Sequence, residues 1–204
     1  MIEYPTMLSP NFHTFYSNWR RKSDEYLRDD LESAFDHFFT LFVIYNRLYA
    51  ETTFLLARRN EIDLNEKRPF PDSKAAKIYV RMFLGDDNLI EQLESDQDSR
   101  EAISAVKALL DGPDRDGHQF SIKLDMIRGD PMPDKDHELL CKLRSDNHIE
   151  KATAILEFVY AIRCNLFHGH KGFDSIQMEV MRPANTLLSK ISEILFNRLN
   201  ESSS

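Results

Sequence analysis

The sequence predicts an all-α fold, because three long segments repeat apolar residues with the period of a helix. The first segment, 24–59, contains no proline or glycine, and its apolar side chains recur at helical spacing over many turns. The other two segments, 148–165 and 175–200, lie near the end of the chain. A further helix over 10–22 would complete a bundle of long helices.

The segment 24–59 is expected to be the central helix of this bundle. Between Phe38 and Tyr45 it is apolar on nearly every face, with Thr40 as the polar exception. A helix that is apolar all round has to be covered on all sides. The cover would come either from the other helices of the chain or from a second subunit.

The two later helices have start signals of their own. Each opens with the spacing of a capping box, Asn147 with Glu150 and Asp174 with Gln177. Pro183 falls inside the last segment, where it predicts either a kink or the start of a new helix.

Residues 61–146 differ from the long helices, because prolines and glycines interrupt them repeatedly. Shorter helices are predicted within them, and 118–127 fits either a helix or a short strand. We therefore expect one domain over 1–204, with its core at 9–60 and 147–201 and a largely helical insertion at 61–146 between the first long helix and the helix at 148–165.

The composition excludes several classes of function. The net charge is -8, from 26 Lys and Arg against 34 Asp and Glu, so no broad positive field attracts nucleic acid over the whole surface. A small basic site is compatible with this charge, since attraction to one phosphate depends on charges within a Debye length of about 8 to 10 Å. Cys141 and Cys164 show no zinc-ligand spacing and are too few for a disulfide framework.

A cytoplasmic protein without membrane contact is expected. The most hydrophobic run, 38–45, is too short to span a bilayer, and the first residues lack the pattern of a signal peptide.

The stretch AIRCNLFHGHKG, residues 161–172, places polar groups at the end of an apolar helix. Arg163 stands where the helical period predicts another apolar residue. An arginine here can complement the helix dipole with its stem in the core, or it can bind an anion. His168 follows about 140° round an ideal helix. The two side chains therefore converge only if the helix ends between them, as Gly169 and Gly172 would allow, or if a second copy of the chain supplies partner groups.

The hexapeptide RCNLFH, Arg163 to His168, matches the R-x4-6-H motif of the HEPN superfamily, the higher eukaryote and prokaryote nucleotide-binding domains. In that superfamily the motif ends a long helix of an α-helical bundle, a long apolar helix precedes it, and a further long helix follows. The sequence resembles this arrangement over its three long helices. The resemblance implies a metal-independent endoribonuclease without a cofactor. It also implies a homodimer with a composite active site, in a toxin–antitoxin or anti-phage defence system with an antitoxin or defence partner protein.

The residues of the motif suit that chemistry. RNA carries its own nucleophile, the 2′-OH, so the protein need supply only proton transfer and charge stabilisation. The resemblance implies that His168 is the general acid or base and that Arg163 holds the scissile phosphate. Asn165 would orient the 2′-OH or the phosphate. The expected products carry a 2′,3′-cyclic phosphate and a 5′-OH.

Three further residues are candidates for substrate binding. His170 and Lys171 would add positive charge for RNA, or they belong to a solvated loop. Asn46 lies near the apolar face of its helix, where a polar group needs a partner, either in the active site or on another helix. His168 and His170 lack a third ligand at a recognisable spacing, so no metal site is predicted.

A second hypothesis concerns a protein of another class. Cys164 occupies a position that is usually polar in active members of the superfamily. In this alternative the chain is a catalytically inactive HEPN module that dimerises or binds a nucleotide or a partner protein. The two hypotheses both predict a dimer and differ in whether RNA is cleaved.

Overall fold

Helices account for most of the residues that the computed structural model describes, and none of those residues forms a strand. The described residues are 10–65, 68–112, 121–125, 127–167 and 176–202. The all-α prediction is therefore confirmed for this part of the chain. The elements are α1 Pro10–Asp24, α2 Leu31–Arg58, α3 Asp72–Lys74, the π-helical turn η1 Ala75–Tyr79, α4 Val80–Leu84, α5 Asp86–Ser95, α6 Gln97–Asp111, α7 Pro133–Arg144, α8 His148–Phe167 and α9 Ile176–Ser202.

The connection between α1 and α2 corrects the start of the helix predicted over 24–59, while the further helix predicted over 10–22 corresponds to α1. α1 ends at Asp24, and α2 begins at Leu31. Asp30 caps α2, since its carboxylate accepts hydrogen bonds from the Ser33 backbone N–H at 2.8 Å and the Ser33 hydroxyl at 2.9 Å. These hydrogen bonds hold the pKa of Asp30 below its ordinary value. The later start of α2 was not predicted because no proline or glycine lies between Asp24 and Leu31.

α2 occupies the centre of the core, in keeping with its apolar sequence. Its largest fully buried side chains are Phe38, Leu41, Ile44, Tyr45, Leu48, Tyr49 and Leu56. Phe39 and Val43, on another face, keep 36% and 37% of their surface exposed. The described chain thus covers most, but not all, of the apolar surface of α2. No described helix, α2 included, combines the length and the apolar composition needed to cross a bilayer.

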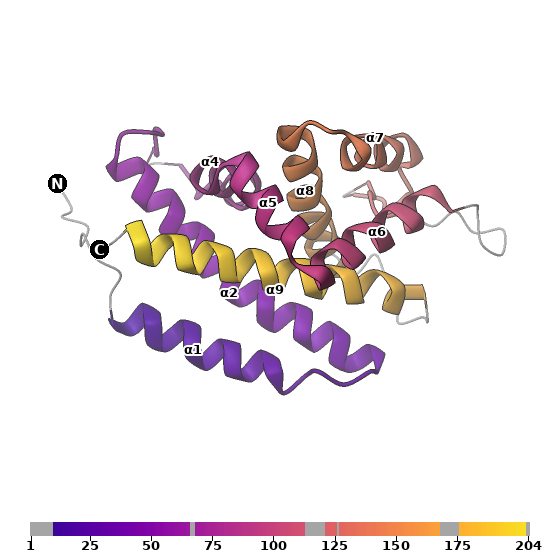
Figure 1. The fold of residues 1–204 in the computed structure, drawn as a ribbon, viewed down its shortest axis with the longest axis horizontal. Coiled ribbons are helices and arrows are strands. Elements are labelled where there is room, and N and C mark those ends of the chain that lie inside the picture. The colour runs from indigo at the N-terminus through magenta and orange to yellow at the C-terminus, as the bar shows by residue number, and fades with distance from the viewer. Residues whose placement is uncertain (1–9, 66–67, 113–120, 126, 168–175, 203–204) are drawn as a thin grey trace.

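α9 lies across α2 and beside α1, on one side of the molecule (Figure 1). Asn185 of α9 donates a hydrogen bond to the backbone carbonyl of Ala34 in α2 at 2.9 Å. α9 continues through Pro183, so the alternative of a new helix at this proline is wrong. α8 runs at a steep angle to α9 (Figure 1).

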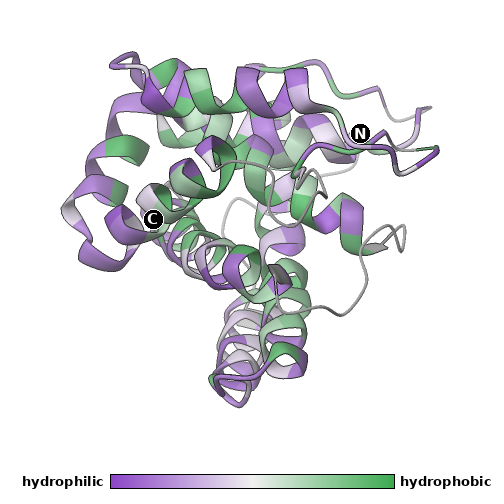
Figure 2. Ribbon diagram, turned by 90° about the vertical axis from the view of Figure 1, so that its right-hand side faces the viewer, coloured by the Kyte–Doolittle hydropathy of each residue, from purple (hydrophilic) through white to green (hydrophobic). Residues whose placement is uncertain are grey.

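The segment 61–146 shares the core of the long helices. Apolar side chains from its helices pack in one cluster with α2, α8 and α9, and they include Val80, Leu84, Leu89, Leu93, Ile103 and Leu139. Most helices carry hydrophobic and hydrophilic stretches side by side (Figure 2), as expected when each buries one face. This segment therefore helps to fix the position of α8.

Residues 121–125, called the extended segment, form a short non-helical connection that Asp136 of α7 holds in place. Asp136 is 7% exposed, and its carboxylate accepts hydrogen bonds from the backbone N–H of Ile122 at 3.1 Å and of Lys123 at 2.8 Å. The Ser121 hydroxyl donates a third hydrogen bond to the same carboxylate. In this described part, neither the helix nor the short strand that the sequence suggested is present, because the chain bends at Ile122 and Lys123 and Leu124 makes an isolated β-bridge with Pro131.

Replacing Asp136 with alanine should release the extended segment from α7. Two backbone N–H groups would lose their acceptor, so we expect the free energy of unfolding, measured in urea, to fall by about 2 to 3 kcal/mol. Asp134→Ala is the matched control, because Asp134 is exposed in the first turn of the same helix and should contribute less than about 1 kcal/mol. Equal losses in the two variants would contradict the role given to Asp136.

Candidate functional site

Arg163 lies on α8, one turn before the end of that helix, and aromatic rings hold its guanidinium. The central carbon of the guanidinium is 5.8 Å from the ring centroid of Phe42 on α2 and 5.7 Å from that of Tyr160 on α8. A quarter of the side chain, 25%, is exposed. Contacts with aromatic rings use the faces of a guanidinium, whereas hydrogen bonds to an anion use its edge. The contact of the arginine with the two rings is therefore compatible with anion binding.

Asp72, the first residue of α3, lies near the same arginine. Its carboxylate accepts a hydrogen bond from the Tyr160 hydroxyl at 2.9 Å and another from the Tyr49 hydroxyl. Arg163 Nη2 is 3.9 Å from Asp72 Oδ2, at the long end of the range for an ion pair. Partly exposed ion pairs contribute little, roughly 0 to 1 kcal/mol. Asp72 therefore favours one direction of the guanidinium without binding it tightly.

The Asp72 carboxylate also acts on the two tyrosines. Burial, the hydrogen bond to Asp72 and the charge of Asp72, in that order of importance, raise the pKa of Tyr160 to about 12. The same causes raise the pKa of Tyr49 well above its ordinary value. Both phenols are consequently neutral hydrogen-bond donors near neutral pH.

A cavity of about 400 Å³ lies beside Arg163, against the second half of α8. Small-molecule sites typically enclose about 300 to 1,000 Å³. The wall comes from η1, the extended segment and α8, and consists of Lys77, Lys123, Leu124, Glu157, Tyr160, Ala161, Arg163, Cys164 and Asn165.

Two lysines from the segment 61–146 share this cavity with the arginine. Lys77 lies in η1, a π-helical turn of a kind that is frequent at functional sites, and its Nζ is 5.2 Å from the ring centroid of Tyr160. Lys123 lies half-buried in the extended segment. Burial is the main cause that lowers the pKa of Lys123, Glu157 opposes this effect, and Lys77 adds to it.

The charge of the cavity wall is positive. Among the described residues that line it, Glu157 is the one acidic side chain against three basic ones. Glu157 also pairs with Lys142 of α7, at 3.3 Å. Because the cations outnumber the carboxylate, an anion is the ligand that this wall favours.

Asn165 and Cys164, which follow Arg163 in the motif, both line this cavity, although in different ways. Asn165 is 3% exposed, and its Nδ2 donates a hydrogen bond to the backbone carbonyl of Ile122 at 2.8 Å. This bond ties α8 to the extended segment. Cys164 is also buried, with its sulfur 4.0 Å from Arg163 Nη1.

None of the other four predicted residues is part of the described cavity. Asn46 is exposed on α2 while its neighbour Tyr45 takes the buried face, so the expectation that Asn46 needs a partner inside the bundle is wrong. His168, His170 and Lys171 lie outside the described residues. Within the described ranges, no three side chains of the metal-ligating types gather in one place.

Four residues of the site were not predicted from the sequence. Tyr160 precedes Arg163 by three positions, a spacing that puts both on one face of a helix, so this signal was present. Asp72, Lys77 and Lys123 come from the segment 61–146, and no motif connects them to the arginine.

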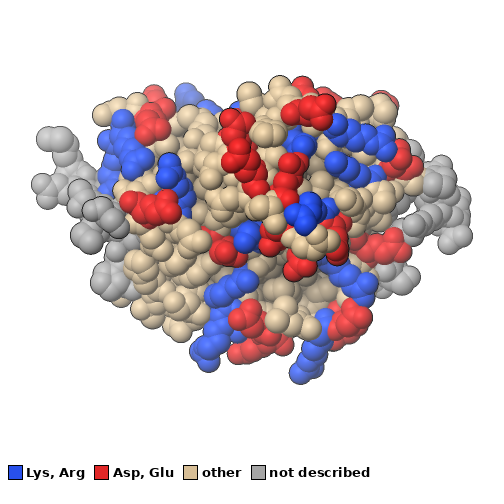
Figure 3. All heavy atoms as spheres, viewed as in Figure 1, with Lys and Arg blue, Asp and Glu red and all other residues tan. Residues whose placement is uncertain are grey.

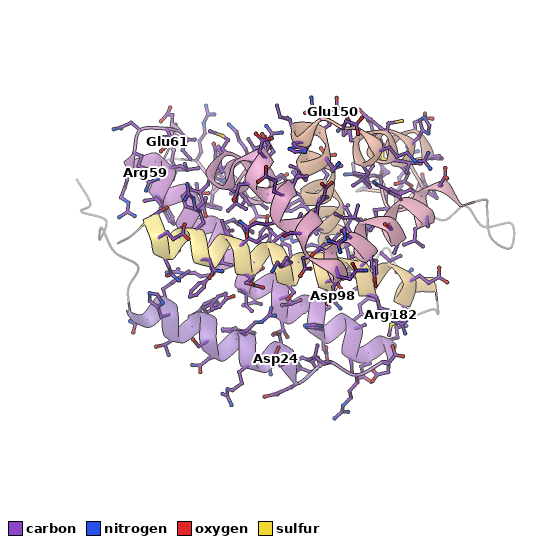
Figure 4. The ribbon with its side chains drawn as sticks, viewed as in Figure 1. Asp24, Arg59, Glu61, Asp98, Glu150 and Arg182 are labelled. Atoms are coloured by element: carbon purple, nitrogen blue, oxygen red, sulfur yellow. The ribbon has the colours of Figure 1, made fainter. Side chains whose placement is uncertain are left out.

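A larger cavity, of about 560 Å³, lies between the start of α2 and helices α6 and α9 and shares no residue with the first. Asp98 and Arg182, labelled in Figure 4, belong to its wall. Several of its charges pair with one another, since Arg182 contacts Asp29 and Lys190 lies 3.3 Å from Glu193. Basic and acidic residues are likewise interspersed on the face seen in Figure 3. The cavity on α8 is therefore the stronger anion site.

Comparison with known proteins identified no relative of this chain. The chain matches no protein-family model, no curated protein and no solved structure. The functional interpretation consequently depends on the geometry of the cavity and on the motif from Arg163 to His168.

Proposed function

We propose that the protein is a metal-independent endoribonuclease of the HEPN type, acting in a toxin–antitoxin or anti-phage defence system. One observation carries the proposal: the Arg163 guanidinium lies over two aromatic rings beside a cavity whose wall contains two more cations. Arginine stays charged at all relevant pH values and matches the geometry of phosphate oxygens. The cavity thus has the charge and the size that a segment of RNA backbone requires.

In the proposed reaction, Arg163 binds the non-bridging oxygens of the scissile phosphate and stabilises the charge that grows on them. The 2′-oxygen attacks phosphorus while a base takes its proton, and the bond from phosphorus to the 5′-oxygen breaks as that oxygen receives a proton. His168 is the proposed acid or base, because histidine exchanges protons near neutral pH. The products carry a 2′,3′-cyclic phosphate and a 5′-OH, and no metal takes part.

We also propose that two copies of the chain complete the site. Phe42, which contacts Arg163, lies on α2 between Phe39 and Val43, and both of these are more than a third exposed. Exposed apolar side chains close to a candidate site favour a protein partner on that face. A second copy seated there would bring its own motif toward this cavity.

The inactive-module hypothesis has one observation in its favour. Asn165 is buried and donates a hydrogen bond to the carbonyl of Ile122, and Cys164 is buried as well, so little of either side chain is exposed to a substrate. In this case the cavity would bind an anionic partner group without turnover.

The enzymatic hypothesis predicts that purified protein cleaves single-stranded RNA in the presence of EDTA. We expect His168→Ala to lower the cleavage rate by roughly 10² to 10⁴ and Arg163→Ala by roughly 10² to 10³. Arg163→Lys keeps the charge but loses the planar fork, so it should stay well below the wild type. Gel analysis of a labelled oligonucleotide measures the rates, and mass spectrometry identifies the cyclic phosphate.

His137→Ala and Arg198→Ala are matched controls for that experiment, because both residues are exposed and neither lines the cavity. Cleavage that requires a divalent metal, or that survives the loss of both Arg163 and His168, would rule out the proposed mechanism. Binding of RNA without any turnover would favour the inactive module.

Asp72 is assigned as a positioning residue for Arg163, and Asp72→Asn tests that role. The variant keeps the shape of the side chain but removes its charge. We expect the pKa of Tyr160 to fall from about 12, because the phenol loses an anionic acceptor, but to stay above about 10 because it remains buried. The RNA cleavage rate should fall through kcat more than through KM.

The pKa in that experiment is read from the tyrosinate absorbance, with Asp72→Asn compared to the same variant carrying Tyr160→Phe. Asp87→Asn is the control, since Asp87 is an exposed carboxylate that pairs with His148. An unchanged pKa of Tyr160 together with unchanged kcat would contradict the assignment.

A further inference from the structure

The two lysines of the cavity are cations for which the described residues supply no paired carboxylate. Among the described residues, neither the Lys77 nor the Lys123 ammonium forms an ion pair with a carboxylate. Lys77 instead lies over the ring of Tyr160, and Lys123 is half-buried. Half-burying an ammonium without a counter-charge costs free energy, so such groups are frequent where a ligand supplies the charge.

Tyr160 places one of these lysines next to the arginine. The Lys77 ammonium is 5.2 Å and the Arg163 guanidinium 5.7 Å from the centroid of the same ring. One aromatic side chain therefore contacts two cations that line the same cavity, and each cation is able to contact a different phosphate of one strand. Lys123 faces the same cavity from the extended segment.

Hydrogen bonds hold the backbone of Lys123 in place. Its N–H is bound by the buried Asp136, and the carbonyl of Ile122 accepts the hydrogen bond from Asn165 on α8. The backbone at Ile122 and Lys123 is thus bonded both to α7 and to α8. A cation held in this way is preorganised for an anion, which lowers the entropy lost on binding.

We infer that Lys77 and Lys123 form a second phosphate subsite, which binds the backbone phosphate next to the scissile one. This inference rests on the proposed endoribonuclease function and adds to it a requirement for a charged neighbour in the substrate. The subsite selects single-stranded RNA with at least two consecutive phosphates over a dinucleotide with one. It also gives the segment 61–146 a part in substrate binding.

The test uses a 2′-O-methyl RNA oligonucleotide with one ribonucleotide, so that cleavage is possible at one linkage. Two further versions carry a neutral methylphosphonate on the 5′ or the 3′ side of that linkage. With the wild-type protein, we expect one of these versions to lower kcat/KM by roughly tenfold to a hundredfold. With Lys77→Gln/Lys123→Gln, the fully charged substrate should already be slower by a similar factor, and the methylphosphonate should have no further effect.

A matched variant and a binding measurement keep the outcomes distinct. Lys190→Gln changes the same charge outside this cavity and should retain the wild-type sensitivity to the methylphosphonate. An equal loss in the wild type and in Lys77→Gln/Lys123→Gln, or no loss in the wild type, would overturn the subsite. Unchanged unfolding midpoints confirm that the variants are folded.

If the proposed function itself is wrong, the wild-type protein will cleave none of these substrates. In that case, fluorescence anisotropy with fully 2′-O-methylated RNA still decides on the subsite. We expect the slope of log affinity against log salt to be smaller by about 0.7 in the double variant, as for the loss of one phosphate contact. An unchanged slope would overturn the subsite independently of catalysis.

Discussion

The contact between the Arg163 guanidinium and the rings of Phe42 and Tyr160 is the interaction on which the rest of the site depends. Packing against these rings keeps the charge partly out of water without neutralising it. Asp72, which also binds the Tyr160 hydroxyl, then favours one direction of the guanidinium. A phosphate would replace this weak, long ion pair at little cost, so the arginine is positioned before a substrate arrives.

The segment 61–146 gives this site its wall and its charge. Asp72, Lys77 and Lys123 all come from it, and they approach Arg163 because its apolar side chains share one core with α2, α8 and α9. A chain with a net charge of -8 cannot attract RNA over its whole surface. It can still bind a backbone phosphate where three cations face one acidic side chain, which is already paired with Lys142.

The helical period gave the long helices correctly, because α2, α8 and α9 each bury one continuous apolar face. The helical period did not predict where α2 begins, because the Asp30 side chain caps that helix and no proline or glycine lies just before it. The motif placed Arg163 and Asn165 at the cavity, but the buried hydrogen bond of Asn165 depends on the extended segment, which no local pattern predicts. Lys77 and Lys123 are separated from Arg163 by many residues, so only tertiary packing brings these charges together.

The central claim is that Arg163 binds a phosphate of RNA in this cavity. An experimental structure of the protein with a fully 2′-O-methylated RNA oligonucleotide tests it most directly. The account predicts a backbone phosphate with two oxygens about 3 Å from the guanidinium nitrogens of Arg163, and a second phosphate near Lys77 and Lys123. An oligonucleotide bound elsewhere, with Arg163 still facing Asp72 and the cavity empty of phosphate, would contradict it.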